Sequence, residues 1–315
     1  MNQLSSRPFL KWTGGKRRLL PQLLPLIPAG KRLIEPFVGA GSVFLACNFS
    51  RLVLADNNPH LISLYRHLQR DATAVAETVR GLFVEANRTP EAYLALRQRF
   101  NSHDTDPLVR AALFVYISRF GFNGLYRTNR QGECNTSYGH LKRVPGFQED
   151  ALLGFAKRLQ QAELYCEDFE RIMDQAVAGD VVYCDPPYAD QADKRSFTGY
   201  GKEGFSWDDQ TRLADKAREL AERGIRVVIS NHDTSSTREL YFGAQLHFLD
   251  VRRSIAAQAD SRGTAHELVA VFGLDCAPAF HSGSTRTRSR VPTSCAVTAA
   301  PSSPTTWGSA RPGRP

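Results

Sequence analysis

Short apolar segments that alternate with amphipathic ones constrain the fold of this chain more than any other feature. Residues 31–37, KRLIEPF, have the pattern of a short strand and lead through a glycine turn, VGAGS, into the helical segment VFLACNF. A second apolar run, RLVLADNN, follows at residues 51–58. A strand, a turn, a helix and another strand in this order predict a parallel β-α-β unit.

The strand-helix rhythm is interrupted and then resumes. Helical patterns follow at residues 60–83, 90–100 and 107–120. The alternation returns with a helix at 150–160, strands at 163–169 and 180–185, a helix at 208–224, a strand at 225–231, a short helix near 236–244, and strands at 245–253 and 267–272. We therefore predict an α/β sheet with a largely helical insertion at 58–150.

Composition favours a globular protein that acts on a polyanion. The chain has 315 residues, is 42% hydrophobic and contains no apolar run near the length that spans a bilayer. We expect a cytoplasmic protein, because the N-terminus also lacks the apolar centre of a signal peptide. The net charge of +8 is compatible with nucleic acid, although five arginines and one aspartate in residues 273–315 supply half of it.

The cysteines and the C-terminal segment carry no predicted site. Six cysteines are scattered without a C-x-x-C pair, which argues against a zinc ribbon and a disulfide framework. We expect reduced, structural cysteines and no metal. Residues 273–315 are rich in Ser, Thr, Pro, Gly and Arg, and this composition predicts a disordered tail.

The segment VVYCDPPY, residues 181–188, ends an apolar strand in a stiff turn. Proline cannot donate to a sheet ladder, so the strand must stop at Cys184 or Asp185. The turn then fixes an acceptor, Asp185, beside the aromatic ring of Tyr188. Such a pair suits transfer to the exocyclic amine of a flat base: Asp185 and the Pro186 carbonyl accept the two amine hydrogens, and Tyr188 stacks on the ring. A base in a duplex would have to be flipped out to reach this site.

The glycine turn after the first predicted strand indicates a nucleoside-containing cofactor. Gly39 and Gly41 would let a ligand approach the backbone, and Asp56, at the end of the next strand, could accept hydrogen bonds from both ribose hydroxyls. Phe44 replaces the third glycine of the dinucleotide fingerprint, which disfavours a nicotinamide or flavin enzyme. Taken alone, the glycine turn and Asp56 are explained equally well by an ordinary structural turn without a ligand.

Seven segments in a fixed order are similar to those of Dam-type DNA adenine-N6 methyltransferases. They are FLKWTGGK, EPFVGAGSVFLA, LADNN, FNGLYRTNRQGECN, VVYCDPPY, VVISNHDT and RRSI. The resemblance covers roughly residues 9–272 and implies a Rossmann-like methyltransferase sheet and S-adenosylmethionine as methyl donor. It makes 1–57 and 151–272 the catalytic domain, and 58–150 the target-recognition domain with a hairpin near 122–142.

The resemblance also implies roles for individual residues. Cofactor contacts would come from Trp12, Lys16, Phe37, Gly39, Gly41, Asp56, Asp168, Phe169 and Asp185. The target-base site would be Asp185, Pro186, Pro187 and Tyr188. Contacts with duplex DNA would come from Lys11, Phe122, Asn123, Leu125, Arg127 and His140.

His140 marks a departure from the family pattern. Members that methylate adenine in GATC usually continue as N-V-P-F-G-R-Y-K, whereas this chain has NTSYGHLK at 135–142. His140 therefore stands where an arginine is expected, and a neutral imidazole offers one donor against five. We expect GATC as the target site, with a DNA contact at His140 that differs from that of the family, and a nucleoid-associated monomer.

Other functions stay open at this point. An amine methyltransferase acting on an RNA base, a cytosine N4 or a glutamine amide would use a similar turn, although those relatives more often have Ser or Asn before the two prolines. A DNA-binding protein that keeps the fold without activity is the alternative of a different class.

Overall fold

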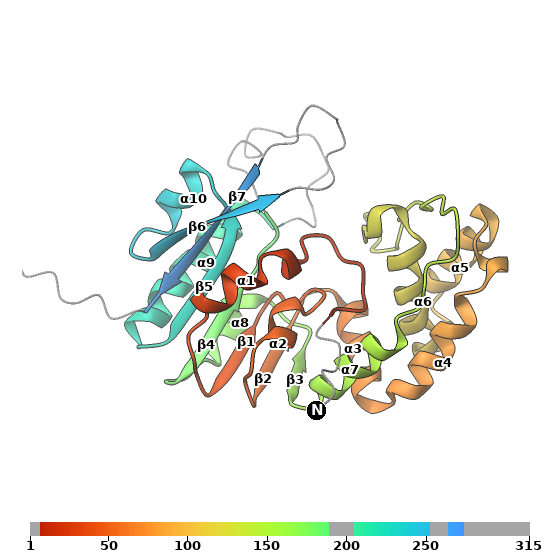
Figure 1. Cartoon of the computed structure of the whole chain (residues 1–315), viewed down its shortest axis with the longest axis horizontal. Coiled ribbons are helices and arrows are strands. Elements are labelled where there is room, and N and C mark those ends of the chain that lie inside the picture. The colour runs from red at the N-terminus through yellow and green to blue at the C-terminus, as the bar shows by residue number, and fades with distance from the viewer. Residues whose placement is uncertain (1–6, 189–204, 253–263, 274–315) are drawn as a thin grey trace, which may run out of the picture. The chain divides into compact units, whose positions relative to one another are not determined.

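The computed structural model describes residues 7–188, 205–252 and 264–273 (Figure 1). In these ranges the chain forms a seven-stranded sheet in the order β3-β2-β1-β4-β5-β7-β6. The strands are β1 Arg32–Glu35, β2 Leu52–Ala55, β3 Ala162–Tyr165, β4 Asp180–Cys184, β5 Arg226–His232, β6 Gln245–Arg252 and β7 Thr264–Phe272. The first five pair in parallel, and β7 is antiparallel to β5 and β6. The predicted α/β class with a Rossmann-like sheet is confirmed.

Alternate residues of each central strand enter two separate hydrophobic cores. In β1, Leu33 belongs to one core and Ile34 to the other, and in β4 the same holds for Val181 and Val182. Successive side chains of a strand point to opposite faces, so both faces of the sheet are covered. This explains why the strands appear in the sequence as continuous apolar runs rather than as alternating ones.

Helices cover both faces. The α-helices are α1 Leu20–Leu23, α2 Ser42–Ala46, α3 Pro59–Arg70, α4 Ala72–Leu82, α5 Pro90–Asn101, α6 Pro107–Phe120, α7 Glu149–Leu159, α8 Phe169–Asp174, α9 Trp207–Glu222 and α10 Ser235–Leu240. Single 3₁₀ turns occur at Lys16–Arg18, Leu24–Leu26, Glu85–Asn87 and Phe122–Gly124. Residues of α8 and α9 line one core, whereas α2, α3, α6 and α7 contribute to the other.

Three helices of the insertion begin in the same way. Each has proline at its first position, and each is preceded by a residue whose side chain accepts a backbone N–H: Asn58, Thr89 or Asp106. Proline has no N–H to lose there, and the cap satisfies one of the free N–H groups of the first turn. These local signals explain why the helix starts are readable from the sequence.

Two sequence predictions of secondary structure are wrong in detail. The predicted helix at 60–83 is two helices, because the Asp71 side chain accepts the N–H of Ala74 and starts α4. The predicted strand at 163–169 ends at Tyr165, since the Asp168 side chain caps the unpredicted helix α8. In both cases a short acidic side chain competes with the regular pattern for backbone N–H groups.

The helices of the insertion pack beside the β3 edge of the sheet (Figure 1). Their buried residues join the same hydrophobic core as one face of the sheet. Between α6 and α7 the chain forms a long loop, which contains the segment near 122–142 where a hairpin is predicted. Two isolated antiparallel bridges, Gly121 with Tyr138 and Thr128 with Cys134, close this loop without regular strands.

The C-terminal segment that is predicted to be disordered comprises residues 273–315. Residues 274–315 of it lie outside the described residues. No helix in the described ranges is long and apolar enough to cross a membrane.

Candidate active site

A pocket of about 770 Å³ lies where β1, β2 and β4 end. The carboxyl ends of neighbouring parallel strands meet at one edge of the sheet, and β1 lies between β2 and β4, so residues distant in sequence converge there. The pocket wall includes every residue that the sequence assigned to the cofactor or the target base: Trp12, Lys16, Phe37, Gly39, Gly41, Asp56, Asp168, Phe169, Asp185, Pro186, Pro187 and Tyr188.

The glycine turn after β1 is tightly packed. Gly39 and Gly41 have φ values of +47° and +74°. Residues other than glycine rarely adopt this backbone conformation. A Cβ atom on Gly41 would lie 2.2 Å from the ring of Phe44, so that position also lacks space. Phe44, which replaces the third glycine of the dinucleotide fingerprint, is thus the residue that packs against Gly41.

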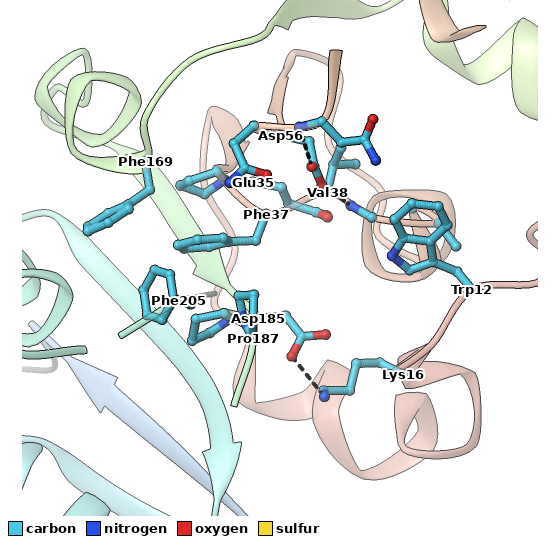
Figure 2. A pocket seen from close by; sticks show the side chains of 18 of the residues that line it. Trp12, Lys16, Glu35, Phe37, Val38, Asp56, Phe169, Asp185, Pro187 and Phe205 are labelled. Carbon is cyan, nitrogen blue, oxygen red and sulfur yellow. Dashed lines mark hydrogen bonds and ion pairs between the residues drawn. The ribbon is translucent and has the colours of Figure 1, made fainter. Parts of the chain in front are cut away.

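Asp56 is hydrogen-bonded to the glycine turn (Figure 2). Its Oδ2 atom accepts the N–H of Gly39 at 3.1 Å, and its Oδ1 atom accepts the N–H of Asn58 at 3.0 Å. Burial raises the pKa of the Asp56 carboxyl to about 6, although both N–H groups favour the charged form. Each oxygen keeps a further lone pair, so the carboxylate can accept hydrogen bonds from a ligand in the pocket.

Aromatic rings form one end of the pocket (Figure 2). Phe37 and Phe169 stack with centroids 5.4 Å apart, and Phe205 meets Phe37 edge to face at 5.4 Å. Asp168 lies beside them, where it caps α8 and accepts a hydrogen bond from Arg212 at 3.0 Å. This end offers flat apolar surfaces to a planar heterocycle.

Sequence reasoning missed Phe205 and Glu35, which both line the pocket. Phe205 belongs to no motif and reaches the site only through the fold. Glu35 ends β1 and is 2% exposed, and its Oε1 atom has no hydrogen-bond partner among the described residues. Burial and the nearby charge of Asp185 raise the pKa of Glu35 well above its usual value. An acid at the end of an apolar strand, directly before a proline, is the signal that could have found it.

Asp185 forms the opposite end of the pocket with Lys16 (Figure 2). The Lys16 Nζ atom lies 2.8 Å from Asp185 Oδ1 and 3.5 Å from Glu267 Oε2, and it donates to the Tyr188 hydroxyl at 2.5 Å. Burial raises the pKa of Asp185 to about 6, and the ammonium opposes that effect. Burial also disfavours the charged form of Lys16, but the surrounding oxygens outweigh it and raise the Lys16 pKa. Each group therefore favours the charged form of the other.

The ring of Tyr188 is held on one side by the protein itself. The imidazole of His232, at the end of β5, lies against it with ring centroids 3.8 Å apart. Sequence reasoning assigned no role to His232, although His232 lies in the segment VVISNHDT, and it also missed Glu267, which lies in none of the seven segments.

Comparison with known proteins decides the family. Residues 12–255 match the model of the D12 class N6 adenine-specific DNA methyltransferases. The chain is 45% identical over 267 residues to the DNA adenine methylase of Escherichia coli strain K12, which covers 85% of this chain and 95% of that protein. This chain belongs to that family. It is also 44% identical to the DNA adenine methylases of Vibrio cholerae, covering 84% of this chain and 96% of the relative, and of Haemophilus influenzae, covering 86% and 95%.

The residues of this methyltransferase that were predicted to contact DNA lie outside the pocket wall, on and near the loop between α6 and α7. Phe122 is 47% exposed although it is apolar, and Asn123 and Arg127 are exposed beside it. Leu125 is half-buried. The stem of Lys11 packs directly on Gly124, whose missing side chain makes room for it. The structure thus brings Lys11 to the loop despite a separation of more than a hundred residues.

His140 of the methyltransferase is exposed on the same loop. Its φ is +48°, and its ring lies 5.1 Å from that of Tyr138. Histidine is one of the few residues other than glycine that is enriched in this backbone region.

Trp12 connects the loop with the pocket. Its ring stacks on Tyr126 with centroids 6.3 Å apart, and it also borders Gly39 in the pocket wall. The methyltransferase has no cluster of three or more His, Cys, Asp or Glu side chains suited to a metal ion within the described ranges.

Proposed function

We propose that this methyltransferase transfers a methyl group from S-adenosylmethionine to N6 of an adenine that is turned out of duplex DNA, within GATC. The observation that carries the proposal is that one pocket holds two carboxylates. The Asp56 carboxylate is hydrogen-bonded to the glycine turn, and the Asp185 carboxylate lies on a proline-rich turn. One acid suits a ribose and the other suits a reacting amine.

The residues of the pocket fit this cofactor. Phe37, Phe169 and Phe205 offer apolar faces to an adenine ring, and Asp56 offers acceptors to ribose hydroxyls. The buried Glu35 has an oxygen without a described partner, which suits an ammonium group such as that of a methionine. When bound, the cofactor would supply an electrophilic methyl group.

Asp185 acts on the target amine. The lone pair of an aromatic amine is delocalised into its ring, so the nitrogen becomes nucleophilic only as its hydrogens are held by acceptors. The Asp185 carboxylate accepts a hydrogen bond from one amine N–H and the Pro186 carbonyl accepts one from the other, and the proton that the nitrogen loses on gaining the methyl group departs on the Asp185 side. Lys16, 2.8 Å from Asp185, favours the ionised form that can accept.

Tyr188 would contact the target base, and the exposed loop would contact the duplex. Tyr188 lines the pocket, where its ring would stack on the flipped adenine. Flipping costs a few kcal/mol, which stacking and hydrogen bonds offset. On the loop, Arg127 would pair with a guanine edge, Phe122 and Leu125 would fill the space that the adenine leaves, and Lys11 and Asn123 would contact bases. One pocket and one asymmetric loop suffice for a monomer to read one strand at a time.

The test is to map N6-methyladenine on a plasmid grown with this protein in a host that lacks DNA methylation, beside the Asp185→Ala variant. We expect methylation confined to GATC in the wild type and none with the variant, while the purified variant still folds and binds duplex DNA. Methylation at another motif would reject GATC but keep the enzyme. Absence of methylated adenine with the wild type, or its persistence with the variant, would contradict the proposed chemistry.

A further inference from the structure

A buried glutamine is hydrogen-bonded to the turn that carries the reacting groups. Gln210, on α9, is fully buried, and its Nε2 atom donates to the carbonyl of Pro187 at 3.0 Å. Gln210 is not part of the pocket wall, although its neighbour Asp209 is. Any effect of Gln210 on the reaction must therefore pass through the turn.

Two further buried side chains hold Gln210 in place. The Nδ2 atom of Asn231, on β5, donates to Gln210 Oε1 at 3.0 Å and to the hydroxyl of Tyr241 at 2.8 Å. The Tyr241 hydroxyl in turn donates to Gln210 Oε1 at 3.3 Å. Asn231 and Tyr241 are 1% and 0% exposed, so water cannot replace these bonds.

Backbone groups at both ends fix the direction of this chain of hydrogen bonds. The Pro187 carbonyl can only accept, so the nitrogen of the Gln210 amide must face it and the oxygen must face Asn231. At the other end, the N–H of His232 can only donate, and it does so to Asn231 Oδ1 at 2.8 Å. The two amides therefore have a single consistent orientation.

The bonded pair connects the turn that carries Tyr188 with His232 on β5. One end is the carbonyl just before Tyr188, and the other is the N–H of His232, whose ring lies against Tyr188. Proline rings fix φ at 186 and 187, which leaves ψ as the soft torsion at each residue. A hydrogen bond to the Pro187 carbonyl restrains the second of these torsions and with it the direction of Tyr188.

We propose that Gln210 is a positioning residue for methyl transfer: its amide, oriented by Asn231 and Tyr241, fixes the turn at 185–188 in the geometry that aims its acceptors and its aromatic ring at the target amine. The inference rests on the proposed function. It predicts that loss of the bond to Pro187 slows the chemical step and leaves the binding of cofactor and DNA intact.

The first test compares Gln210→Met with Gln69→Met. Gln69, on α3, is a matched control, because its amide also donates to backbone carbonyls, those of Leu159 and Ala162, both at 2.7 Å. Gln210→Met should lower the single-turnover rate of methyl transfer at saturating cofactor and DNA by roughly ten- to hundredfold. The dissociation constants for cofactor and DNA should stay within about twofold of wild type. Gln69→Met should leave all three quantities unchanged.

The second test uses pH to restore the missing donor. In Gln210→Glu the carboxyl has nearly the shape of the amide, and only its protonated form can donate to the Pro187 carbonyl. The ratio of the Gln210→Glu rate to the wild-type rate should therefore rise by roughly tenfold as pH falls from about 8 to about 6. Dividing the two rates at each pH cancels the effect of Asp185 titration on the rate, because both enzymes contain Asp185.

Two results would overturn the positioning role. One is a Gln210→Met rate within about twofold of wild type, or a loss no larger than that of Gln69→Met. The other is a rate ratio for Gln210→Glu that does not change with pH, and this measurement decides alone if Gln210→Met does not fold. Failure of the proposed function would show differently, as a wild-type protein that transfers no methyl group to adenine.

Discussion

Asp185 forms an ion pair with Lys16, and this pair sets the expected pH dependence of the reaction. Its pKa is raised to about 6, so the carboxyl becomes neutral and loses an acceptor as pH falls through that value. The pKa of Lys16 is raised as well, so Lys16 stays charged throughout and adds no change of its own. We expect kcat/KM for DNA, measured at saturating cofactor, to fall by roughly tenfold per pH unit below about pH 6. A profile that is flat from about pH 5 to pH 8 would contradict this role of the carboxylate.

His140 gives a second prediction at the level of one side chain. We expect His140→Arg to leave cofactor affinity unchanged and to tighten DNA binding or change site preference, because the guanidinium adds donors that can reach a base edge or a phosphate. Competition binding with GATC duplexes and singly altered duplexes measures both effects. Lys142→Arg, an exposed change of similar length two residues away, is the control. Equal affinity and equal preference in wild type and variant would count against a DNA contact at this position.

Residue by residue, the sequence predicted the parts of the pocket that lie in compact motifs. Asp56 and Asp185 follow strands directly and Gly39 lies in the turn after β1, so their place at one edge of the sheet is implied by the strand pattern. Gln210 and Glu267 could not be found in this way, since their contacts depend on how α9 and β7 pack, and neither has a motif around it. Long-range packing leaves no local trace in a single sequence.

At the level of elements, β1 and β4 are joined at the end far from the pocket. Arg32, which begins β1, donates through Nη2 to Asp180 Oδ2 at 2.6 Å and to the Gln175 carbonyl at 3.0 Å. Asp180 begins β4, and the side chains of Arg32 and Asp180 are 14% and 4% exposed, so removing Asp180 leaves a largely buried guanidinium without its carboxylate. We expect Asp180→Ala to lower the free energy of unfolding by about 3 kcal/mol.

Urea unfolding of three proteins tests this prediction. Glu163→Ala is the control, because the Arg51–Glu163 pair at 3.9 Å is exposed and should contribute less than about 1 kcal/mol. The cofactor affinity of folded Asp180→Ala should equal that of wild type, as the pair lies at the opposite end of the strands. A loss of stability no greater than that of the control would mean that the pair is as weak as a surface pair.

The elements themselves were predictable to different degrees. Continuous apolar runs identified the central strands, and helical patterns identified α3, α5 and α6, whose prolines and capping residues the structure explains. The break between α3 and α4 was missed, because the apolar periodicity continues across Asp71 and only its side-chain bond to Ala74 shows the cap. The hairpin predicted near 122–142 lies in a loop that is closed by isolated antiparallel bridges, and such bridges need no strand pattern in the sequence.

At the level of the whole molecule, a ligand held by several elements should stabilise the fold. The pocket is lined from the ends of β1, β2 and β4 and from the starts of α2, α8 and α9, so binding couples these elements. S-adenosylmethionine at about a hundred times its dissociation constant should add about 2.7 kcal/mol to the free energy of unfolding. Thermal unfolding with S-adenosylmethionine, with NAD and without ligand measures the effect. Equal stabilisation by NAD would contradict the cofactor assignment.

The order of the strands has a consequence for how the enzyme is made. β7 is the last described strand along the chain, yet it lies between β5 and β6 and carries Glu267, 3.5 Å from the Lys16 ammonium. While a ribosome has released the chain only as far as β6, the sheet still lacks an internal strand, and β6 has no final partner to pair with. Synthesis must therefore pass β7 before the sheet and the catalytic pocket are complete, which makes activity one of the last properties that the growing polypeptide acquires.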